Sequence, residues 1–346
     1  MANLYVTEQG AVLRKSGDRL IVEKDDQELL EIECFKIDAV FLFGGVQVTT
    51  HALTELLEHG ISLVLLTQDG ALKGRLVPPV SKNVLLREAQ YRRHFDADFS
   101  LGLARLQVGA KVRSCRSLLS RQVRNHPELD LEDVLSNLSA LEKKTATAAT
   151  LEELLGLEGV AARTFFKGFA RACRKELKFP GRRKHPPTDP VNALLSLGYV
   201  LLGTELAALL EGTGFDPYLG FYHRLAYGRM SLALDLLEEF RAVIDQLVLR
   251  LTNLGVIGPE DFQEAAKTGA AGETTVEKSG ELPGVCLKAP ALRKFLQAYG
   301  EHLSRTFCDE QTKQQATVRS LARRQVERLA AHVLRNEDYV PCYLRL

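Results

Sequence analysis

The segment PPVSKN, residues 78–83, divides the sequence into two parts with different patterns. Before it, short apolar or β-branched runs of five to nine residues are separated by Gly or Asp, which is typical of β-strands. After it, apolar residues recur with the 3.6-residue spacing of helices over long stretches, as in 101–123 and 191–210. We therefore predict an α+β protein, with a small β-rich N-terminal domain over residues 1–80 and a larger all-α C-terminal domain over residues 81–346.

Within the first part, the pattern predicts several strands and a single helix. The predicted strands cover residues 3–8, 11–15, 18–24, 28–34, 36–44, 61–67 and 70–77. The helix lies within residues 49–60, where Thr49 is a capping residue, leucines follow at helical spacing and Gly60 ends the run. A small sheet must cover its edges or pair them with another chain. Since two-fold homodimers are the commonest soluble assemblies, we expect this domain to form a dimer.

Composition limits the class of protein. The chain has 346 residues, of which 45% are hydrophobic and 26% charged, as in a soluble globular protein of two domains. No apolar run is expected to be long enough to span a membrane, and the N-terminal stretch lacks the layout of a signal peptide. Six scattered cysteines without a C-x-x-C pair argue against a disulfide framework or a structural zinc site. We therefore expect a cytoplasmic protein.

The charge is balanced overall but uneven along the chain. The net charge is +1, yet residues 81–125 carry ten Lys or Arg against three acids, and residues 160–190 carry nine against two. Between them, residues 126–158 carry eight acids and two lysines. Two basic blocks on a neutral chain indicate a surface that binds a polyanion. Solvated helix faces would give the same composition, so composition alone leaves both interpretations open.

Three stretches of the second part carry side chains suited to metal chemistry. Asp235 and Glu238 lie three residues apart in an apolar helical run, so both carboxylates belong to one helix face. His223 precedes them by a short loop, and Glu158 follows another helical run beside the small residue Gly159. Each residue alone also fits an ordinary role, as a solvated glutamate, a hydrogen-bonded histidine or a partner in a helix salt bridge.

Taken together, four stretches resemble one known family. They are LEGVAARTFF (157–166), PTDPVNALLSLGYVLL (187–202), GFDPYLGFYH (214–223) and SLALDLLEEFR (231–241). In this order and spacing they resemble the CRISPR-associated endonuclease of spacer acquisition, which is the integrase of the adaptation step. The β-rich N-terminal part, LLREAQY (85–91) and the tail YVPCYLRL (339–346) extend the resemblance over essentially the whole chain.

The resemblance implies a catalytic set and a metal. Glu158, His223 and Glu238 fall on the metal ligands of the family, and Asp235 falls on a second acid close to the metal. Some members carry Asp where this chain has Glu238, and either carboxylate can bind a hard cation. Tyr199 matches a tyrosine near the site. Oxygen ligands with one imidazole and no thiolate favour Mg²⁺ or Mn²⁺.

The implied function is that of a metal-dependent DNA endonuclease/integrase. Such an enzyme captures fragments of foreign DNA and inserts them into a CRISPR array by attack of a 3′-hydroxyl on a phosphodiester, in antiviral defence. The metal polarises the phosphodiester and neutralises the charge that develops on its oxygens. The resemblance also implies double-stranded DNA as substrate, a homodimer joined through the β-rich domains, and a small second CRISPR-associated protein that bridges two dimers.

Basic residues near these motifs are predicted to bind the phosphate backbone of DNA without reading its sequence. They are Arg163, Lys167, Arg182, Arg183, Lys184, Arg224 and Arg229. A non-catalytic helical scaffold that binds DNA is an alternative, although it would have no need of all four acidic and histidine residues. A helical hydrolase of small phosphoesters is a third interpretation, which the two basic blocks make less suitable.

Overall fold

The structure, a computed structural model, describes all residues except 1, 78–82, 184–185, 266–283, 310–312 and 314. Its N-terminal part contains two four-stranded sheets. The first sheet has the order β1-β5-β7-β8, with β1 at Ala2–Val6, β5 at Ile37–Phe43, β7 at Ser62–Leu66 and β8 at Leu72–Leu76. The second has the order β4-β3-β2-β6, with β4 at Gln27–Glu33, β3 at Arg19–Lys24, β2 at Val12–Ser16 and β6 at Gln47–Val48.

These elements confirm the strands and the helix predicted for the first part. Helix α1 covers Thr50–Glu58, and the Thr49 side chain accepts a hydrogen bond from the N–H of Ala52 at its start. A 3₁₀ turn, η1 at Cys34–Lys36, precedes β5. The two-residue strand β6, which pairs in parallel with β2, was not predicted because so short a segment has no recognisable alternation.

Strand β5 connects the two parts of the protein. Phe41 and Phe43 on one face of β5 belong to the core of the helical part, whereas Val40 and Leu42 on the other face belong to the core beneath the second sheet. The alternation follows from the two-residue period of a strand. Both faces are buried, which explains why β5 is apolar from Ala39 to its end at Phe43. The two predicted domains therefore meet through a shared apolar face, and Arg75 of β8 adds an ion pair to Glu211 at 2.7 Å.

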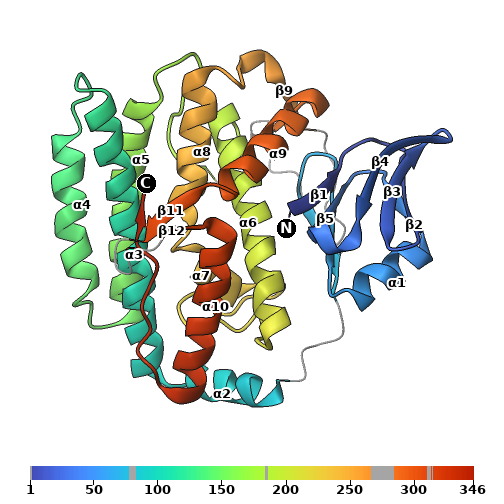
Figure 1. Cartoon of the computed structure of the whole chain (residues 1–346). Helices are drawn as coiled ribbons and strands as arrows, with labels where there is room; N and C mark the ends of the chain where they lie inside the picture. The colour runs from blue at the N-terminus through green and yellow to red at the C-terminus, as the bar shows by residue number, and fades with distance from the viewer. Residues whose placement is uncertain (1, 78–82, 184–185, 266–283, 310–312, 314) are drawn as a thin grey trace, which may run out of the picture.

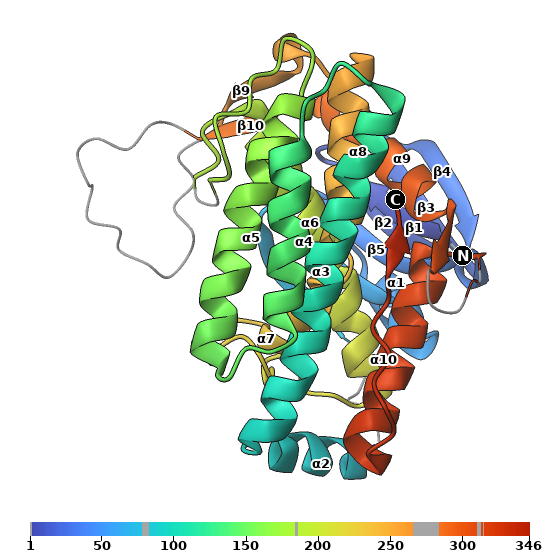
Figure 2. The same ribbon diagram turned by 90° about the vertical axis from the view of Figure 1, so that its left-hand side faces the viewer.

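The C-terminal part is built mainly of helices (Figures 1 and 2). They are α2 at Val84–His94, α3 at Ala97–Asn125, α4 at Glu132–Thr145, α5 at Leu151–Ala172, α6 at Pro190–Thr213, α7 at Ser231–Leu237, α8 at Arg241–Leu254, α9 at Ala289–Leu303 and α10 at Val318–Arg335. Helices α3, α4 and α5 lie side by side in both views, on the side of the molecule away from the sheets. Helix α6 lies between this layer and the sheets (Figure 1).

Helix α6 corrects the expectation that no apolar run is long enough to span a membrane. In the part of the chain that the structure describes, α6 is the one helix with sufficient length and apolar composition. It is mostly buried inside the protein, where it packs against α7, α8 and α10. A helix buried on nearly every side is apolar all round, so core packing explains its composition.

The prediction of an all-α C-terminal domain is wrong in one respect, because short strands also occur there. Strand β9 at Phe262–Glu264 pairs antiparallel with β10 at Val285–Leu287, just after a 3₁₀ turn, η2, at Pro259–Asp261. A second small sheet has the order β12-β11-β13, with β12 at Gln315–Thr317, β11 at Thr306–Asp309 and β13 at Leu344–Arg345. Strands of two to four residues are too short to show periodicity, and tertiary pairing decides them.

The C-terminal tail fixes the end of α7. The Glu239 carboxylate accepts hydrogen bonds from the Cys342 N–H at 2.7 Å and from the Tyr339 hydroxyl. Burial raises the pKa of Glu239 to about 7. Glu239 is the neighbour of Glu238 in the chain, so the tail contributes to the position of a candidate site residue.

Candidate active site

Glu158 and Glu238 converge on the side chain of Lys111, and His223 lies beside Glu238. Glu158 lies in the middle of α5, Glu238 follows the last residue of α7, and Lys111 lies in the middle of α3. The Lys111 ammonium pairs with Oε1 of Glu158 and with Oε2 of Glu238, the latter at 2.6 Å. The Lys111 side chain is 11% exposed, so this pair of carboxylates shares one nearly buried cation.

His223 lies in the loop between α6 and α7, with an acid on each side of its ring. Its Nδ1 is 2.7 Å from Oδ1 of Asp235, and its Nε2 is 3.8 Å from Oε1 of Glu238. A hydrogen bond from Nδ1–H to Asp235 leaves the lone pair of Nε2 available, which is the usual arrangement of a metal-binding histidine. The ring is therefore oriented toward Glu238.

Both carboxylate oxygens of Asp235 accept hydrogen bonds from the backbone of the His223 loop. Its two oxygens accept the N–H groups of Phe221 at 2.6 Å, Tyr222 at 3.0 Å and His223 at 2.9 Å. A Cβ at Gly220 would lie 2.6 Å from Oδ2 of Asp235, so this close approach requires glycine. Asp235 was predicted as a catalytic acid close to the metal. The structure places it as the residue that holds the histidine loop.

The electrostatics of Glu238 favour its ionised form. Burial alone would raise the pKa of this carboxyl, but the positive charges of Arg241 and Lys111 outweigh burial and hold the pKa well below its usual value. The Nε of Arg241 is 2.9 Å from Oε2 of Glu238. Glu238 is therefore ionised at neutral pH.

Tyr199 and Asp245 support the arginine beside this site. The Tyr199 hydroxyl donates a hydrogen bond to Oδ1 of Asp245. The guanidinium of Arg241 lies over the Tyr199 ring, 4.9 Å from its centroid, and that of Arg182 lies 5.5 Å from it. Burial raises the pKa of Asp245 to about 7, and burial together with Asp245 raises the pKa of Tyr199 well above its usual value. The tyrosine therefore lies near the site with its hydroxyl engaged.

The three predicted ligands fit a divalent cation once the lysine moves. Among the residues that the structure describes, no group of three or more His, Cys, Asp or Glu side chains is already disposed to hold a metal. The Lys111 ammonium contacts both Glu158 and Glu238 in this arrangement. One cation can nevertheless contact both carboxylates, as this ammonium does, and His223 Nε2 lies beside Glu238. Two carboxylates and an imidazole suit Mg²⁺ or Mn²⁺.

The predicted DNA-binding residues fall into different environments. Arg163 and Lys167 are exposed on α5, after Glu158, and Arg183 is exposed in the connection to α6. Arg182 is only partly exposed and donates hydrogen bonds to Asn192 at 2.8 Å and Ser196 at 3.2 Å. It is therefore part of the interior beside Tyr199 rather than a free surface cation.

The remaining predicted cations lie around the loop after His223. Arg224 is 76% exposed and pairs with Glu152 of α5 at 2.9 Å. Arg229 is partly exposed near the start of α7. Lys184, also predicted to bind DNA, lies outside the described residues. The tip of the loop carries a fully exposed aromatic ring, Tyr227.

Sequence reasoning missed Lys111 and underestimated Arg241 and Asp245. Lys111 was one of ten cations in the first basic block, and its distinction, burial between two acids, depends on how α3 packs against α5. Arg241 was considered only as a salt-bridge partner on the helix surface, although it lies three residues after Glu238. Asp245 lies outside the motifs, and only its position opposite Tyr199 reveals it.

Comparison with known proteins identifies the family. The sequence model described as CRISPR associated protein Cas1 matches residues 4–301, which is most of the chain. The chain belongs to the Cas1 family. At the level of the family, this membership identifies a CRISPR-associated nuclease or integrase. A Cas1 endonuclease of Thermodesulfovibrio yellowstonii is 30% identical over 343 residues, which cover 98% of this chain and 99% of the relative.

Other relatives place the Cas1 sequence in longer proteins. A Cas4 exonuclease/Cas1 endonuclease fusion of Geobacter sulfurreducens is 38% identical over 272 residues, 76% of this chain, and the match spans about half of the fusion, 49% of its length. Among solved structures, a Cas6-RT-Cas1–Cas2 complex matches 99% of this chain and 36% of that chain, with a TM-score of 0.81 and 25% identity. A casposase bound to its integration product matches 98% and 93%, with a TM-score of 0.80 and 24% identity, which shows the shared fold.

Proposed function

We propose that this Cas1 family member is a metal-dependent DNA endonuclease/integrase that inserts captured DNA fragments into a CRISPR array. The observation that carries the proposal is the shared contact of Glu158 and Glu238 with one cation, the Lys111 ammonium, with His223 Nε2 beside Glu238. A Mg²⁺ or Mn²⁺ ion bound there supplies Lewis acidity toward a phosphodiester and neutralises charge on its oxygens. Glu158, His223 and Glu238 would hold this ion.

The surrounding residues prepare the site for this chemistry. Asp235 holds the His223 loop and fixes the ring tautomer, so Nε2 points to the cation position. Arg241 stays beside Glu238, where its positive charge keeps the carboxylate ionised. Lys111, once displaced from between the carboxylates, retains a charged ammonium close to the site, where it can contact a phosphate oxygen.

The proposed substrate is double-stranded DNA. Arg163, Lys167 and Arg183 are exposed cations on and after the helix that carries Glu158, where they would contact phosphates. Tyr227, fully exposed at the tip of the loop that follows His223, would stack on a base. Exposed cations and an aromatic ring around a cation position fit a nucleic acid better than a small phosphoester.

We also propose the assembly and its compartment. The outer strand β4 of the second sheet carries Leu29 and Leu30, which are 49% and 42% exposed, and Phe35 of η1 is 67% exposed. This apolar edge supports a homodimer formed through the N-terminal sheets. The similar chain of the Cas6-RT-Cas1–Cas2 complex supports a small Cas2-type protein as the second partner. Such a machinery would work on DNA in the cytoplasm.

One observation favours the non-catalytic scaffold as a second candidate. The ion pairs of Lys111 with Glu158 and Glu238 would equally suit a closed structural network that needs no metal. Structural networks of this kind also shift pKa values. The two candidates differ in a single property, the binding of a divalent cation.

Strand transfer on a supercoiled plasmid with a CRISPR repeat tests the proposal. The full-length protein is assayed with and without Mn²⁺ and the Cas2-type partner, and so are Glu158→Ala, His223→Ala and Glu238→Ala. We expect each variant to lose about 1000-fold or more in rate, equal to about 4 kcal/mol of transition-state stabilisation. Glu88→Ala, which removes an exposed glutamate of α2, is the matched control and should act as the wild type. Absence of strand transfer by the wild type with Mn²⁺ and the partner would favour the scaffold, and wild-type rates in the three site variants would contradict the assignment of these residues.

A further inference from the structure

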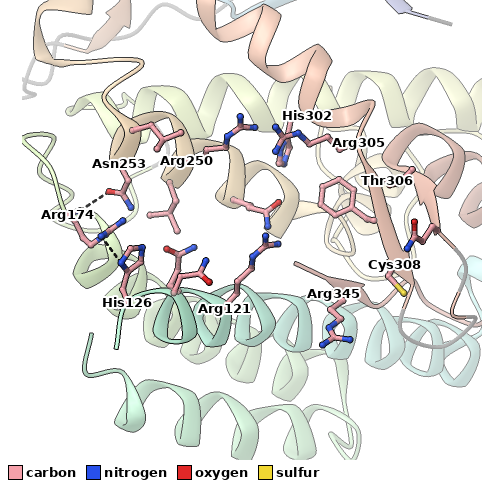
Figure 3. A pocket seen from close by; sticks show the side chains of 17 residues that line it. Arg121, His126, Arg174, Arg250, Asn253, His302, Arg305, Thr306, Cys308 and Arg345 are labelled. Atoms are coloured by element: carbon pink, nitrogen blue, oxygen red, sulfur yellow. Dashed lines mark hydrogen bonds between the residues drawn. The ribbon is translucent and has the colours of Figure 1, made fainter. Parts of the chain in front are cut away.

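A second site is suggested by a hollow of ≈ 520 Å³ at the ends of α3, α8 and α9 (Figure 3). No Asp or Glu is among the described residues that line it. Five arginines line it, namely Arg121, Arg174, Arg250, Arg305 and Arg345. Its size is within the usual range of pockets for small ligands. A concave surface with this charge favours an anion.

The positive charge of the hollow is not compensated by the protein. Within the described part of the chain, none of the five arginines forms an ion pair with a carboxylate. Some exposed arginines elsewhere do: Arg171 pairs with Asp133 at 2.7 Å, and Arg224 with Glu152 at 2.9 Å. The five arginines of the hollow therefore share one concave surface without a carboxylate of the described chain to neutralise them.

Three of these side chains point toward the same space. Figure 3 shows Arg121 rising from α3 on one wall, with Arg250 of α8 and Arg305, just after α9, on the opposite wall. A guanidinium presents up to five N–H donors and no acceptor. A ligand between these walls would meet donors from both sides, as a phosphate group requires.

A buried histidine gives an independent indication of a ligand. His302 is 1% exposed and lines the hollow, and its Nε2 is 3.0 Å from the carbonyl oxygen of Val243. Its Nδ1 is buried without a hydrogen-bond partner. Burial lowers the pKa of His302 to about 4, and the charges of Arg305 and Arg250 lower it further in the same direction. The ring is therefore neutral, with Nε2–H donating to Val243 and Nδ1 left as a bare acceptor.

Stabilisation of helix ends would be a simpler role for these arginines. Helices α3, α8 and α9 end at Asn125, Leu254 and Leu303, and cations near a helix C-terminus are favourable. Arginines with that role commonly donate to the last carbonyl groups. In the described part of the chain, the side chains of Arg121, Arg250 and Arg305 donate to no carbonyl. Their donors remain available to a ligand.

The hollow is separate from the active site. Glu158, His223 and Glu238 are not among its lining residues. Arg121 follows Lys111 by 121 − 111 = 10 residues on α3, which is about 15 Å along the helix axis. Binding in the hollow can therefore be measured without metal.

We propose that this hollow binds a phosphate group that carries a neighbouring hydroxyl, as in a nucleotide. Arg121, Arg250 and Arg305 would donate to the phosphate oxygens, and His302 Nδ1 would accept the hydroxyl proton in a hydrogen bond. This chemistry is shared by a free nucleotide and by the phosphorylated end of a nucleic-acid strand. The inference goes beyond the proposed function, since it requires neither the metal site nor strand transfer.

Calorimetric titration of the full-length protein in EDTA tests the proposal. The probes are inorganic phosphate, adenosine 5′-monophosphate, and a single-stranded 12-mer with or without a 5′-phosphate. We expect the monophosphate to bind, and Arg250→Gln and Arg305→Gln each to weaken it about tenfold, as expected for a lost charge-assisted hydrogen bond. Arg92→Gln, the same change at an exposed arginine of α2, should leave binding unchanged. Arg121→Gln provides a second variant from the opposite wall.

The titrations with the 12-mer distinguish the end of a nucleic-acid strand from a free nucleotide as the ligand. Competition by the phosphorylated 12-mer, lost in Arg250→Gln, would identify a strand end, whereas competition by the monophosphate alone would identify a free nucleotide. Two results would overturn the proposal: no binding of phosphate or monophosphate by the wild type at millimolar concentration, or wild-type affinity in the folded Arg121, Arg250 and Arg305 variants. Displacement of the ligand by a poly-glutamate peptide at equal affinity would also overturn it, because the site would then select charge and not phosphate.

Discussion

The candidate active site around Lys111 and Glu238 differs from the arginine hollow in the pairing of its charged side chains. In this cluster, Lys111 and Arg241 are nearly buried and each contacts Glu238. In the hollow, Arg250 and Arg305 are exposed and have no carboxylate partner in the described chain. Paired carboxylates around one cation indicate a place where cations exchange. Unpaired arginines around a hollow indicate a place where an anion enters. The difference shows that the pairing of charges, more than their number, indicates the ligand.

The largest effect should follow removal of the cation that the cluster already contains. Lys111→Met leaves the buried Glu238 beside the partly exposed Glu158 without the cation that they share, so we expect the free energy of unfolding in EDTA to fall by about 3–5 kcal/mol. Mn²⁺ should restore most of this loss, because it would occupy the same position. Urea denaturation with and without Mn²⁺ measures both values. Lys143→Met, at an exposed lysine of α4, is the matched control. An equal loss of stability with and without Mn²⁺ would show that the metal does not take the place of the Lys111 ammonium.

The next largest effect concerns Asp245, which accepts the hydrogen bond of the Tyr199 hydroxyl. Burial raises the pKa of Asp245 from 3.8 to about 7, so the folded protein keeps this proton where the unfolded chain has lost it. Stability contributed by Asp245 is therefore present below about pH 4 and declines as the pH rises toward 7. We compare the unfolding free energy of the wild type with that of Asp245→Asn. The wild-type value minus the variant value should fall by about 3–4 kcal/mol between pH 4 and pH 8. Asp130→Asn, at an exposed aspartate, should show no such trend. A difference that rises with pH would contradict the assignment.

A smaller effect should distinguish Asp235 of α7 from Glu238, which follows that helix. Asp235→Asn disturbs the backbone hydrogen bonds of the His223 loop but removes no ligand, so Mn²⁺ affinity should fall about 10- to 100-fold. Glu238→Gln removes a ligand and should cost more. Isothermal titration with Mn²⁺ compares the two variants. Equal losses would make Asp235 a direct ligand of the metal, a possibility that the sequence left open.

The smallest effect compares two neighbouring arginines. Arg183→Ala should lower the slope of log K against log salt for duplex DNA by about one unit, because a single phosphate contact is lost. Arg182→Ala should instead lower thermal stability, since this side chain is hydrogen-bonded to Asn192 and lies over Tyr199. Fluorescence anisotropy at several salt concentrations and thermal unfolding measure the two quantities. An unchanged salt slope for Arg183→Ala would make this residue an ordinary solvated arginine.

Local pattern predicted most of the fold. The strands of the first part and α1 follow from alternation and from the cap at Thr49, and the long helices follow from their apolar period. Contacts between distant segments were not predictable in the same way. Strand β13 exists because Arg345 pairs with Cys308, and Phe41 faces the helical core because the first sheet packs against it.

For the candidate site too, contacts between distant segments were not predictable from the sequence. The motifs brought Glu158, His223 and Glu238 to attention, and the structure places Glu158 and Glu238 against Lys111 and His223 beside Glu238. The spacing of Asp235 and Glu238 placed both on one helix face, but it could not tell which would meet the loop backbone and which the cation. Lys111 carries no local signal, because its role depends on the packing of α3 against α5 and α7.

Direct titration of the full-length protein with Mn²⁺ tests the central claim, that Glu158, His223 and Glu238 form a divalent-cation site. Calorimetry of the metal-free wild type should show one site per chain, and Glu158→Gln and Glu238→Gln should each weaken it at least about 100-fold, more than loss of a supporting residue. Glu88→Gln should bind Mn²⁺ as the wild type does. Equal Mn²⁺ affinity in the wild type and both site variants would contradict the account and leave Lys111 as the permanent cation of a structural network.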